Sequence, residues 1–445
     1  MSITVLLKNH LPNIPPSIGR LLNYLPYSMR PGLSQVYTRR SLEIQENSAF
    51  SLDERRNFVF TRIKKLVDYS YEHVPFYFEF YNQKNFHPSE LRCFKDIQKI
   101  PIVDKTILSG YPIEKRSSKI ANKYLVNTGG STGSPFSFFI QDSSIGHEWA
   151  HMHVIWQKLG YKSSDLKLLF GGRSNIKNIV DYDFLRNHFA LDIYADYNLV
   201  AEKLTKLLQR HQVRYLHGYP SSIYDFALFC RDENPLLLKL LAKNLKGVFL
   251  GSEYPHSVYR DAIETIFKVE TISWYGHTER AVLAYEKNED YKYEPFITYG
   301  FSEALSCNDK EYSLIGTSYY NFASPLIRYN TDDIISDPVL NEGILESFKI
   351  ARGRNGDVVI DKNNKKINLT GLIFGRHHDL FNHCNFLQVK QVVNGKIEIH
   401  FVSSEITQEQ ASKLFDSRNL ELDVDFVKRD TPIRTSSGKI NLLIK

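Results

Sequence analysis

The pattern of apolar and polar residues over most of the chain predicts helices that alternate with short buried strands. From Asp53 to about Tyr71, apolar side chains recur at helical spacing, at Phe58, Ile63, Leu66 and Val67. Further on, four short apolar runs each end in a turn, at Leu166–Phe170, Val213–Leu216, Gly247–Leu250 and Thr271–Trp274. Repetition of strand, turn and helix predicts an α/β fold with mostly parallel sheets flanked by helices.

The pattern changes after residue 353. Val389–Val393 and Lys396–Phe401 flank Asn394-Gly395 and predict a β-hairpin with a tight turn. Thr407 can cap a helix that runs to about Phe415, and Leu422–Val427 predicts another strand. We therefore expect a large α/β domain over residues 1–353 and a small C-terminal α+β domain over residues 354–445.

Composition and charge narrow the class of protein. The 445 residues are 42% hydrophobic and carry a net charge of +6 without a concentrated basic block, which argues against disorder and against nucleic-acid binding. The four cysteines are far apart, which favours reduced thiols and a cytoplasmic protein. Prolines interrupt the N-terminal apolar run, so we expect no transmembrane segment, while peripheral membrane contact stays open. The oligomeric state is not indicated.

The densest chemical signal is the loop Thr128-Gly129-Gly130-Ser131-Thr132-Gly133-Ser134-Pro135. Its glycines and hydroxyl groups can wrap phosphate oxygens without steric hindrance. It is not a Walker loop, because no lysine follows the last glycine. A flexible linker has the same composition, so the loop by itself leaves both interpretations open.

Six further segments carry recognisable motifs. They are Ser70–Lys105, Gly251-Ser252-Glu253, Tyr275-Gly276-His277-Thr278-Glu279, Arg328–Asp333, Gly353–Asp357 and Arg434–Ile440. Together with the glycine-rich loop, and in the same order, they resemble the motifs of the adenylate-forming superfamily, which includes acyl-CoA synthetases, nonribosomal peptide adenylation domains and luciferase. Within it the chain is most similar to the phenylacetate-CoA ligase and CapK branch.

The resemblance implies a reaction and a site. The reaction is attack of a carboxylate on the α-phosphate of ATP, followed by transfer of the acyl group to an acceptor. Catalysis is implied for Lys439, Thr278 and Glu279, and Glu279 is also the implied Mg²⁺ ligand. The implied nucleotide site comprises Thr128, Gly129, Gly130, Ser131, Thr132, Gly133, Gly251, Ser252, Glu253, Tyr275, Gly276, Asp333 and Arg354. Gly356 occupies the implied hinge.

The family pattern is not matched everywhere. Asp332 stands where glycine is usual, so either Asp332 or Asp333 can be the ribose ligand, and we expect Asp333. Gly356 stands where the family often has a hinge aspartate or lysine, and the wide conformational range of glycine suits a hinge. The candidate substrate pocket comprises His217, Tyr219, Trp274 and His277, with Arg173 nearby in the sequence pattern.

The function expected from the resemblance is an ATP-dependent, AMP-forming carboxylate ligase in capsular or O-antigen polysaccharide synthesis. ATP and Mg²⁺ are the expected cofactors, and CoA or an amine is the acceptor. An aryl- or acyl-CoA ligase is the first alternative. A second is a zinc hydrolase, because His147-Glu148-Trp149-Ala150-His151 matches HExxH. A third is a nucleotide-binding relative without catalytic activity.

Overall fold

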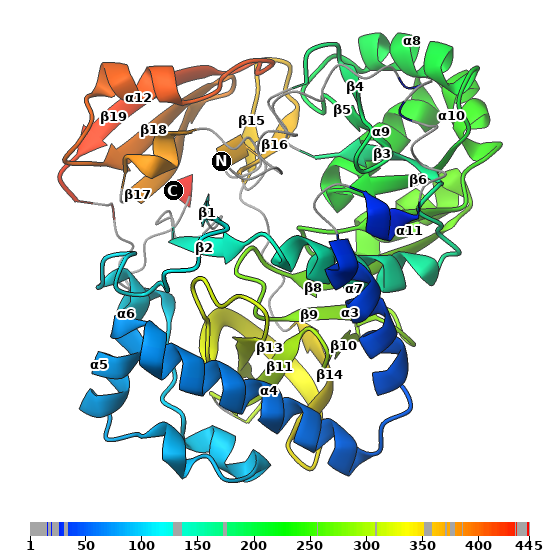
Figure 1. The fold of residues 1–445 in the computed structure, drawn as a ribbon. Helices are drawn as coiled ribbons and strands as arrows, with labels where there is room; N and C mark the ends of the chain where they lie inside the picture. The colour runs from blue at the N-terminus through cyan, green and yellow to red at the C-terminus, as the bar shows by residue number, and fades with distance from the viewer. Residues whose placement is uncertain are drawn as a thin grey trace.

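The computed structural model describes residues 26–30, 34–127, 136–171, 176–255, 257–307, 309–350, 358–369, 379–384 and 386–431, together with Pro16, Gly19, residues 372–373, Ile433 and residues 443–444. Among these residues, the sequence folds around a twelve-stranded sheet with helices on both faces, and a separate four-stranded sheet near the C-terminus (Figure 1). The predicted α/β class, with helices on the faces of a large sheet and a smaller C-terminal sheet, is therefore confirmed.

The N-terminal region is helical. Its helices are η1 (Tyr27–Met29), α3 (Ser34–Asn47), α4 (Leu52–His73), α5 (Pro75–Gln83), η2 (Pro88–Glu90), η3 (Phe94–Lys99) and α6 (Lys105–Ser109). Helix α4 is the helix that the apolar spacing predicts. It begins at a capping box in which Ser51 and Glu54 satisfy each other's backbone N–H groups. Its buried face includes Ile63, Leu66 and Val67.

One half of the large sheet is parallel. Its strands are β3 (Leu166–Phe170), β5 (His188–Leu191), β6 (Val213–Gly218), β7 (Gly247–Leu250) and β8 (Glu270–Gly276). Helices α8 (Tyr197–Leu208), α9 (Pro220–Asp232), α10 (Pro235–Ala242) and α11 (Ser257–Phe267) pack on one face, and α7 (Ser144–Gln157) packs on the other. The strands are buried on both faces, which explains why they are nearly continuous apolar runs.

The other half of the sheet is antiparallel and corrects the expectation of mostly parallel strands. Short connections join most of these strands, and a short connection cannot return a chain to a parallel neighbour. The strands are β4 (Val180–Asp183), β9 (Leu283–Glu286), β10 (Tyr293–Pro295), β11 (Gly300–Ser306), β12 (Tyr312–Ser318), β13 (Tyr329–Asn341) and β14 (Ile344–Ile350).

Two strands outside this sheet frame the glycine-rich loop. Strand β1 (Lys123–Asn127) pairs with β2 (Ser137–Gln141), and Asn127 lies opposite Ser137. Residues 128–135 themselves lie outside the described part of the chain. The pairing still fixes where the loop must begin and end, because its two flanking strands are neighbours.

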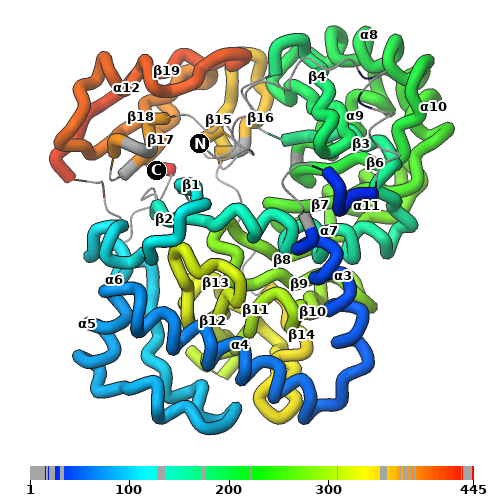
Figure 2. Tube along the Cα trace, in the orientation of Figure 1, coloured from blue at the N-terminus to red at the C-terminus, as the bar shows by residue number. Residues whose placement is uncertain are grey.

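The C-terminal region has its own sheet and its own core. Its elements are β15 (Val358–Ile360), β16 (Lys366–Asn368), η5 (Asp379–Asn382), β17 (Phe386–Val393), β18 (Lys396–Val402), α12 (Gln408–Leu414), β19 (Asp423–Arg429) and β20 (Leu443–Ile444). The hairpin turn places Gly395 at a φ of 81°, and Thr407 caps α12, as predicted. Figure 2 shows this region next to the α8–α9 side of the large sheet. The domain boundary at residue 353 lies outside the described residues and stays a prediction.

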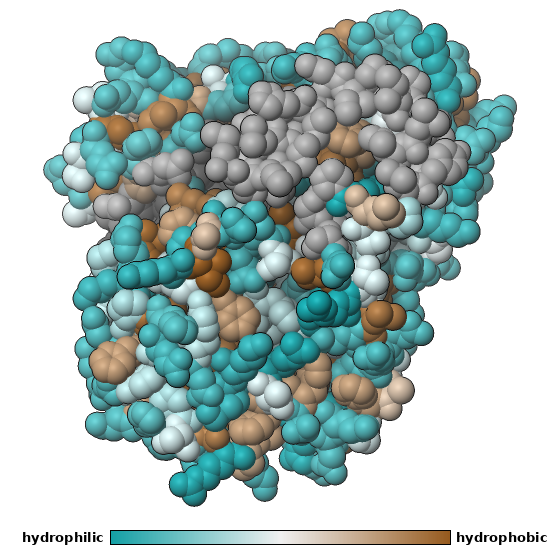
Figure 3. Space-filling model, in the orientation of Figure 1, coloured by the Kyte–Doolittle hydropathy of each residue, from teal (hydrophilic) through white to brown (hydrophobic). Residues whose placement is uncertain are grey.

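The surface agrees with the composition. In the face that Figure 3 shows, hydrophobic atoms occur in small groups among a hydrophilic majority. Among the described residues, no helix is both long and apolar enough to cross a bilayer. All four cysteines are free thiols.

Candidate active site

Three of the turns predicted at strand ends meet at one edge of the large sheet. Strands β6, β7 and β8 are parallel neighbours, so Gly218 lies beside Leu250, which lies beside Ser273. The segments that follow these strands therefore start side by side at their carboxyl ends. In parallel sheets this edge is the usual place for a ligand.

Tyr275 and Asp333 come together although 58 positions separate them in the chain. The Tyr275 hydroxyl, at the end of β8, donates a hydrogen bond of 2.6 Å to Oδ2 of Asp333 on β13. Asp332 is exposed and has a φ of 61°, the left-handed conformation in which glycine is easiest. The aspartate therefore occupies a backbone position that suits the glycine of the family pattern. Asp333 therefore contacts the Tyr275–Glu279 motif directly.

Glu279 is held by two neighbours. His277 Nε2 lies 3.3 Å from the backbone N–H of Val282, so Nε2 accepts and the ring proton is on Nδ1. Nδ1 lies 3.1 Å from one Glu279 oxygen, and the Tyr329 hydroxyl donates to the other at 3.3 Å. Burial raises the pKa of Tyr329, which keeps this hydroxyl protonated. The carboxylate is thus positioned by two donors, while Thr278 and Gly276 beside it are exposed.

Gly251 lies directly against an indole ring. A β-carbon at this position would stand 2.4 Å from Cζ2 of Trp274. No real β-carbon approaches so closely, so only glycine fits here without displacement of the ring. Ser252 and Glu253 follow Gly251 in the turn after β7.

Only some of the residues of the predicted substrate pocket lie together. The ring of His217 lies 5.6 Å from that of Trp274 and 5.2 Å from that of Trp156, between centroids. Tyr219 instead lines a hollow between α9 and the β15–β16 hairpin. His277 contacts Glu279 as described, which gives it a role in positioning that carboxylate.

The histidines of the HExxH segment are buried in the interior of the protein. Nδ1 of His151 lies 2.9 Å from the His147 carbonyl, and Nε2 lies 2.9 Å from the Thr298 hydroxyl, so both ring nitrogens are occupied. Burial lowers the pKa of His151 to about 3. Glu148 accepts a hydrogen bond from Tyr299. Among the described residues, no group of His, Cys, Asp and Glu is arranged to hold a metal ion. The match is therefore a packing feature, and the zinc hydrolase has no support.

Several predicted residues lie outside the described part of the chain. They are Thr128, Gly129, Gly130, Ser131, Thr132, Gly133, Arg173, Arg354, Gly356 and Lys439. Their roles stay predictions.

Two buried ion pairs, which the sequence pattern does not predict, stabilise this edge of the large sheet. Arg328, at the start of the Arg328–Asp333 motif, forms a bidentate pair with Glu303 at 3.0 and 2.9 Å. Its other guanidinium nitrogen donates to the carbonyls of Gln98 and Ile100. The motif's arginine therefore anchors β13 to the N-terminal region. No spacing signal links such partners in advance.

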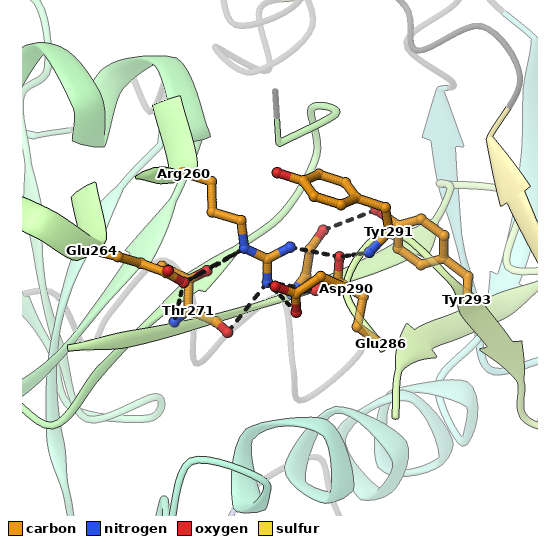
Figure 4. A network of polar contacts seen from close by, with 8 residues as sticks. Arg260, Glu264, Thr271, Glu286, Asp290, Tyr291 and Tyr293 are labelled. Atoms are coloured by element: carbon orange, nitrogen blue, oxygen red, sulfur yellow. Dashed lines mark hydrogen bonds and ion pairs between the residues drawn. The ribbon is translucent and has the colours of Figure 1, made fainter. Parts of the chain in front are cut away.

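The second pair is the centre of the network in Figure 4. Arg260 on α11 donates two hydrogen bonds of 2.8 Å to Glu286 on β9, and both side chains are 2% exposed. Arg260 also donates to the hydroxyl of Thr271 on β8 at 2.7 Å. The backbone N–H of Ser273 donates to Glu286 at 2.9 Å. This network ties the helix that follows Gly251–Glu253 to the strand that carries Tyr275.

Comparisons with known proteins agree with this arrangement. No family model matches the sequence. The chain is 23% identical to Protein CapK of Staphylococcus aureus over 395 residues, which are 85% of this chain and 80% of that protein.

Two solved structures of 2-hydroxyisobutyryl-CoA ligase have a similar fold. One, with 2-HIB-AMP and CoA in the thioesterification state, has a TM-score of 0.56. The other, with 2-HIB-AMP in the postadenylation state, has a TM-score of 0.53. Each is 17% identical and covers 89% of this chain and 90% of the ligase. The resemblance to adenylate-forming ligases that the motifs predict is therefore confirmed at the level of the fold.

Proposed function

We propose that this protein is an ATP-dependent, AMP-forming carboxylate ligase that activates an acid as its acyl-adenylate and transfers the acyl group to an acceptor. The observation that carries the proposal is the contact between Tyr275 and Asp333 beside Glu279. Two motifs from distant parts of the chain meet at the edge of the sheet where an α/β fold binds ligands. The similarity in fold to a ligase solved with an acyl-AMP supports the same chemistry.

Each residue then has a part in the first half-reaction. Tyr275 offers a ring beside adenine, and the turn Gly251–Glu253 borders it. Asp333 accepts hydrogen bonds from the ribose hydroxyls, because a carboxylate is an acceptor only. Residues 128–133 surround the phosphates, and Arg354 contacts the ribose or a phosphate.

The main chemical problem is that two anions must meet. The carboxylate of the acid attacks the α-phosphate, and pyrophosphate leaves. Lys439 brings a positive charge to both groups, and the hydroxyl of Thr278 donates to the α-phosphate. Charge placed in advance lowers the barrier, because the repulsion is offset before the reaction begins.

Glu279 fits a Mg²⁺ ligand. It is a carboxylate, the class of oxygen ligand that Mg²⁺ prefers, and hydrogen bonds with His277 and Tyr329 hold it in place. When bound, Mg²⁺ supplies charge neutralisation for the phosphates. Gly356 serves as the hinge about which residues 354–445 turn between the two half-reactions.

The proposal has two versions, which differ in the acceptor of the acyl group. The resemblance to the CapK branch implies transfer to an amine or a sugar in polysaccharide synthesis, and the 23% identity to Protein CapK supports that resemblance. Similarity in fold to a ligase solved with CoA supports an acyl-CoA ligase as the second candidate. Both share the first half-reaction.

Exchange of radiolabelled pyrophosphate into ATP tests the first half-reaction. We expect exchange with at least one member of a panel of aryl, fatty, amino and uronic acids. Lys439→Ala should lower the exchange rate at least about a hundredfold, the scale for loss of one prearranged charge. Lys428→Ala is a matched control. An unchanged rate in Lys439→Ala would remove this lysine from the mechanism, and no exchange with any acid would contradict the proposed function.

A further inference from the structure

A hollow lined by tyrosines lies next to the candidate active site. It opens at the carboxyl edge of β5 and β6, between α8, α9 and α11 of the large sheet and the β15–β16 hairpin. Five tyrosines contribute to its wall, namely Tyr194, Tyr197, Tyr219, Tyr224 and Tyr259. A tyrosine ring packs against the face of a polar ring compound, and its hydroxyl can hydrogen-bond to that compound's own hydroxyls.

The hollow adjoins the turn that we assign to the nucleotide. Tyr259 lies in the first turn of α11, shortly after Gly251–Glu253. Its pKa is raised by burial and, to a lesser extent, by the carboxylates of Glu253 and Asp225. Tyr259 lines the hollow and lies on the helix that follows this turn, so a molecule in the hollow would be a neighbour of the acyl-adenylate.

Asp225 gives the hollow a chemical preference. Its side chain lines the hollow, and it forms no hydrogen bond or ion pair with any residue that the structure describes. Burial raises its pKa to about 6, against the opposing charges of Lys365 and Lys366. A carboxylate taken out of water in this way gains most from a cation that can approach it directly.

Two lysines, Lys365 and Lys366, also line the hollow. Nζ of Lys365 donates to the carbonyl of Ile193 at 2.8 Å and lies 4.1 Å from the ring centroid of Tyr197. Among the described contacts, neither lysine forms an ion pair with Asp225 within 4 Å. The Asp225 carboxylate is therefore left for a ligand.

We propose, on the basis of the proposed function, that this hollow binds the acyl acceptor, and that the acceptor is a primary amine on a hydroxylated ring of the amino-sugar type. The ammonium group pairs with Asp225, and the tyrosines hold the ring.

Acyl transfer to the amine needs only the acyl-adenylate and the acceptor. The amine nitrogen gives its lone pair to the acyl carbon of the acyl-adenylate, and a C–N bond forms. The bond from that carbon to the phosphate oxygen breaks, and its electron pair leaves with AMP. The nitrogen releases one proton from its ammonium form before attack and one after the C–N bond forms, and both pass to solvent. No further reactant is needed.

The hollow depends on the position of the β15–β16 hairpin. Val358, Lys365, Lys366 and Ile367 form one wall of the hollow, so the site is complete only while β15 and β16 lie against α8 and α9. An acceptor in the hollow would therefore bind the C-terminal region in this orientation more tightly than in any other.

Calorimetric titration of the full-length protein tests the proposal. The probes are glucosamine, galactosamine, lysine, N-acetylglucosamine, which keeps the ring but lacks the basic nitrogen, and CoA. We expect an amino sugar to bind, its N-acetyl form to bind much more weakly, and Asp225→Asn to weaken amino-sugar binding roughly tenfold or more. Asp232→Asn, at the far end of the same helix, is the matched control and should bind normally.

Activity measurements separate this inference from the proposed function. Pyrophosphate exchange should be unchanged in Asp225→Asn, which also shows that the variant folds, while amine-dependent AMP release should fall. The inference is overturned if no amine binds, if lysine binds but no amino sugar does, or if Asp225→Asn binds amino sugars as the parent does. It is also overturned if CoA alone accelerates AMP release. Absence of exchange in the parent protein would instead overturn the proposed function.

Discussion

At the scale of the residue, the site depends on which group donates each hydrogen bond. The Val282 amide fixes the tautomer of His277, which then holds Glu279, and the Tyr275 hydroxyl holds Asp333. The sequence could predict the residues that carry the motifs, because these recur with fixed types and spacing. It could not predict Tyr329 or Val282 as their partners, since those contacts arise only when β8, β9 and β13 meet.

Tyr275→Phe should weaken ATP binding. The ring stays in place, but Asp333 loses the hydrogen bond from the Tyr275 hydroxyl, and a hydrogen bond to a charged group contributes about 1.5 kcal/mol or more. We therefore expect the KM for ATP in pyrophosphate exchange to rise roughly tenfold, with a smaller change in the maximal rate. Tyr285→Phe, on the neighbouring strand β9, is the control. Equal KM values for parent and Tyr275→Phe would argue against Asp333 as the ribose ligand.

A buried lysine outside the candidate active site should make the stability of the fold depend on pH. Lys167 on β3 is 1% exposed, donates to the Tyr161 hydroxyl at 2.8 Å and lies 4.1 Å from the ring of Trp156. Burial lowers its pKa well below the value of 10.5 that it has when exposed. Between the folded and unfolded pKa values the unfolded chain binds the extra proton, so stability rises as pH rises through that window.

Lys167→Met should therefore be more stable than the parent near pH 7, by about 1–4 kcal/mol. Its advantage should shrink as the pH approaches 10, because the parent gains stability there and the variant has no such group. Urea denaturation at several pH values measures this. A difference that does not change with pH would show that Lys167 has the same pKa in both states.

At the scale of the element, apolar runs predicted the central strands well, because strands buried on both faces must be apolar throughout. The antiparallel half was harder to predict. β13 carries Asn330, Thr331, Asp332 and Asp333 and is interrupted by register shifts, so it lacks a regular alternation. Its pairing depends on short connections and on the Arg328–Glu303 ion pair, which no local pattern reveals.

The Arg260–Glu286 pair should be required for the packing of α11 against β8 and β9. Arg260→Met removes one partner and leaves a buried carboxylate that still accepts from Ser273, which should lower the free energy of unfolding by about 3–5 kcal/mol. Arg231→Met, an exposed arginine on α9, is the control. Combining Arg260→Met with Glu286→Gln should recover part of the loss. Unfolding curves that coincide for parent and Arg260→Met would contradict this role.

At the scale of the whole molecule, the C-terminal region was predicted from its change in pattern, and it has a separate core around Val359, Leu387, Ile399 and Phe401. How this region contacts the large sheet could not be predicted, because the contact rests on single side chains. Tyr194 of the large sheet packs against the C-terminal core, and Lys365 reaches the Ile193 carbonyl.

Lys365→Ala should loosen this contact. Hydrogen exchange is expected to become faster in residues 193–197 and in β16, while β17 and β18 keep their protection, because Leu387, Ile399 and Phe401 bury these strands in the C-terminal core. Lys362→Ala is a matched control in the same hairpin, since Lys362 pairs with Asp423 inside the C-terminal region at 2.6 Å. If both variants exchange alike, Lys365 does not hold the two parts together.

The contact between Gly251 and Trp274 has a consequence for how this site can diverge. A larger residue at 251 would collide with the indole, and a smaller ring at 274 would leave a void beside the glycine. Each position is thus constrained by the other, so the spacing between the turn and the indole can change only when both residues change together. Relatives in which this spacing differs should carry paired replacements here rather than single ones.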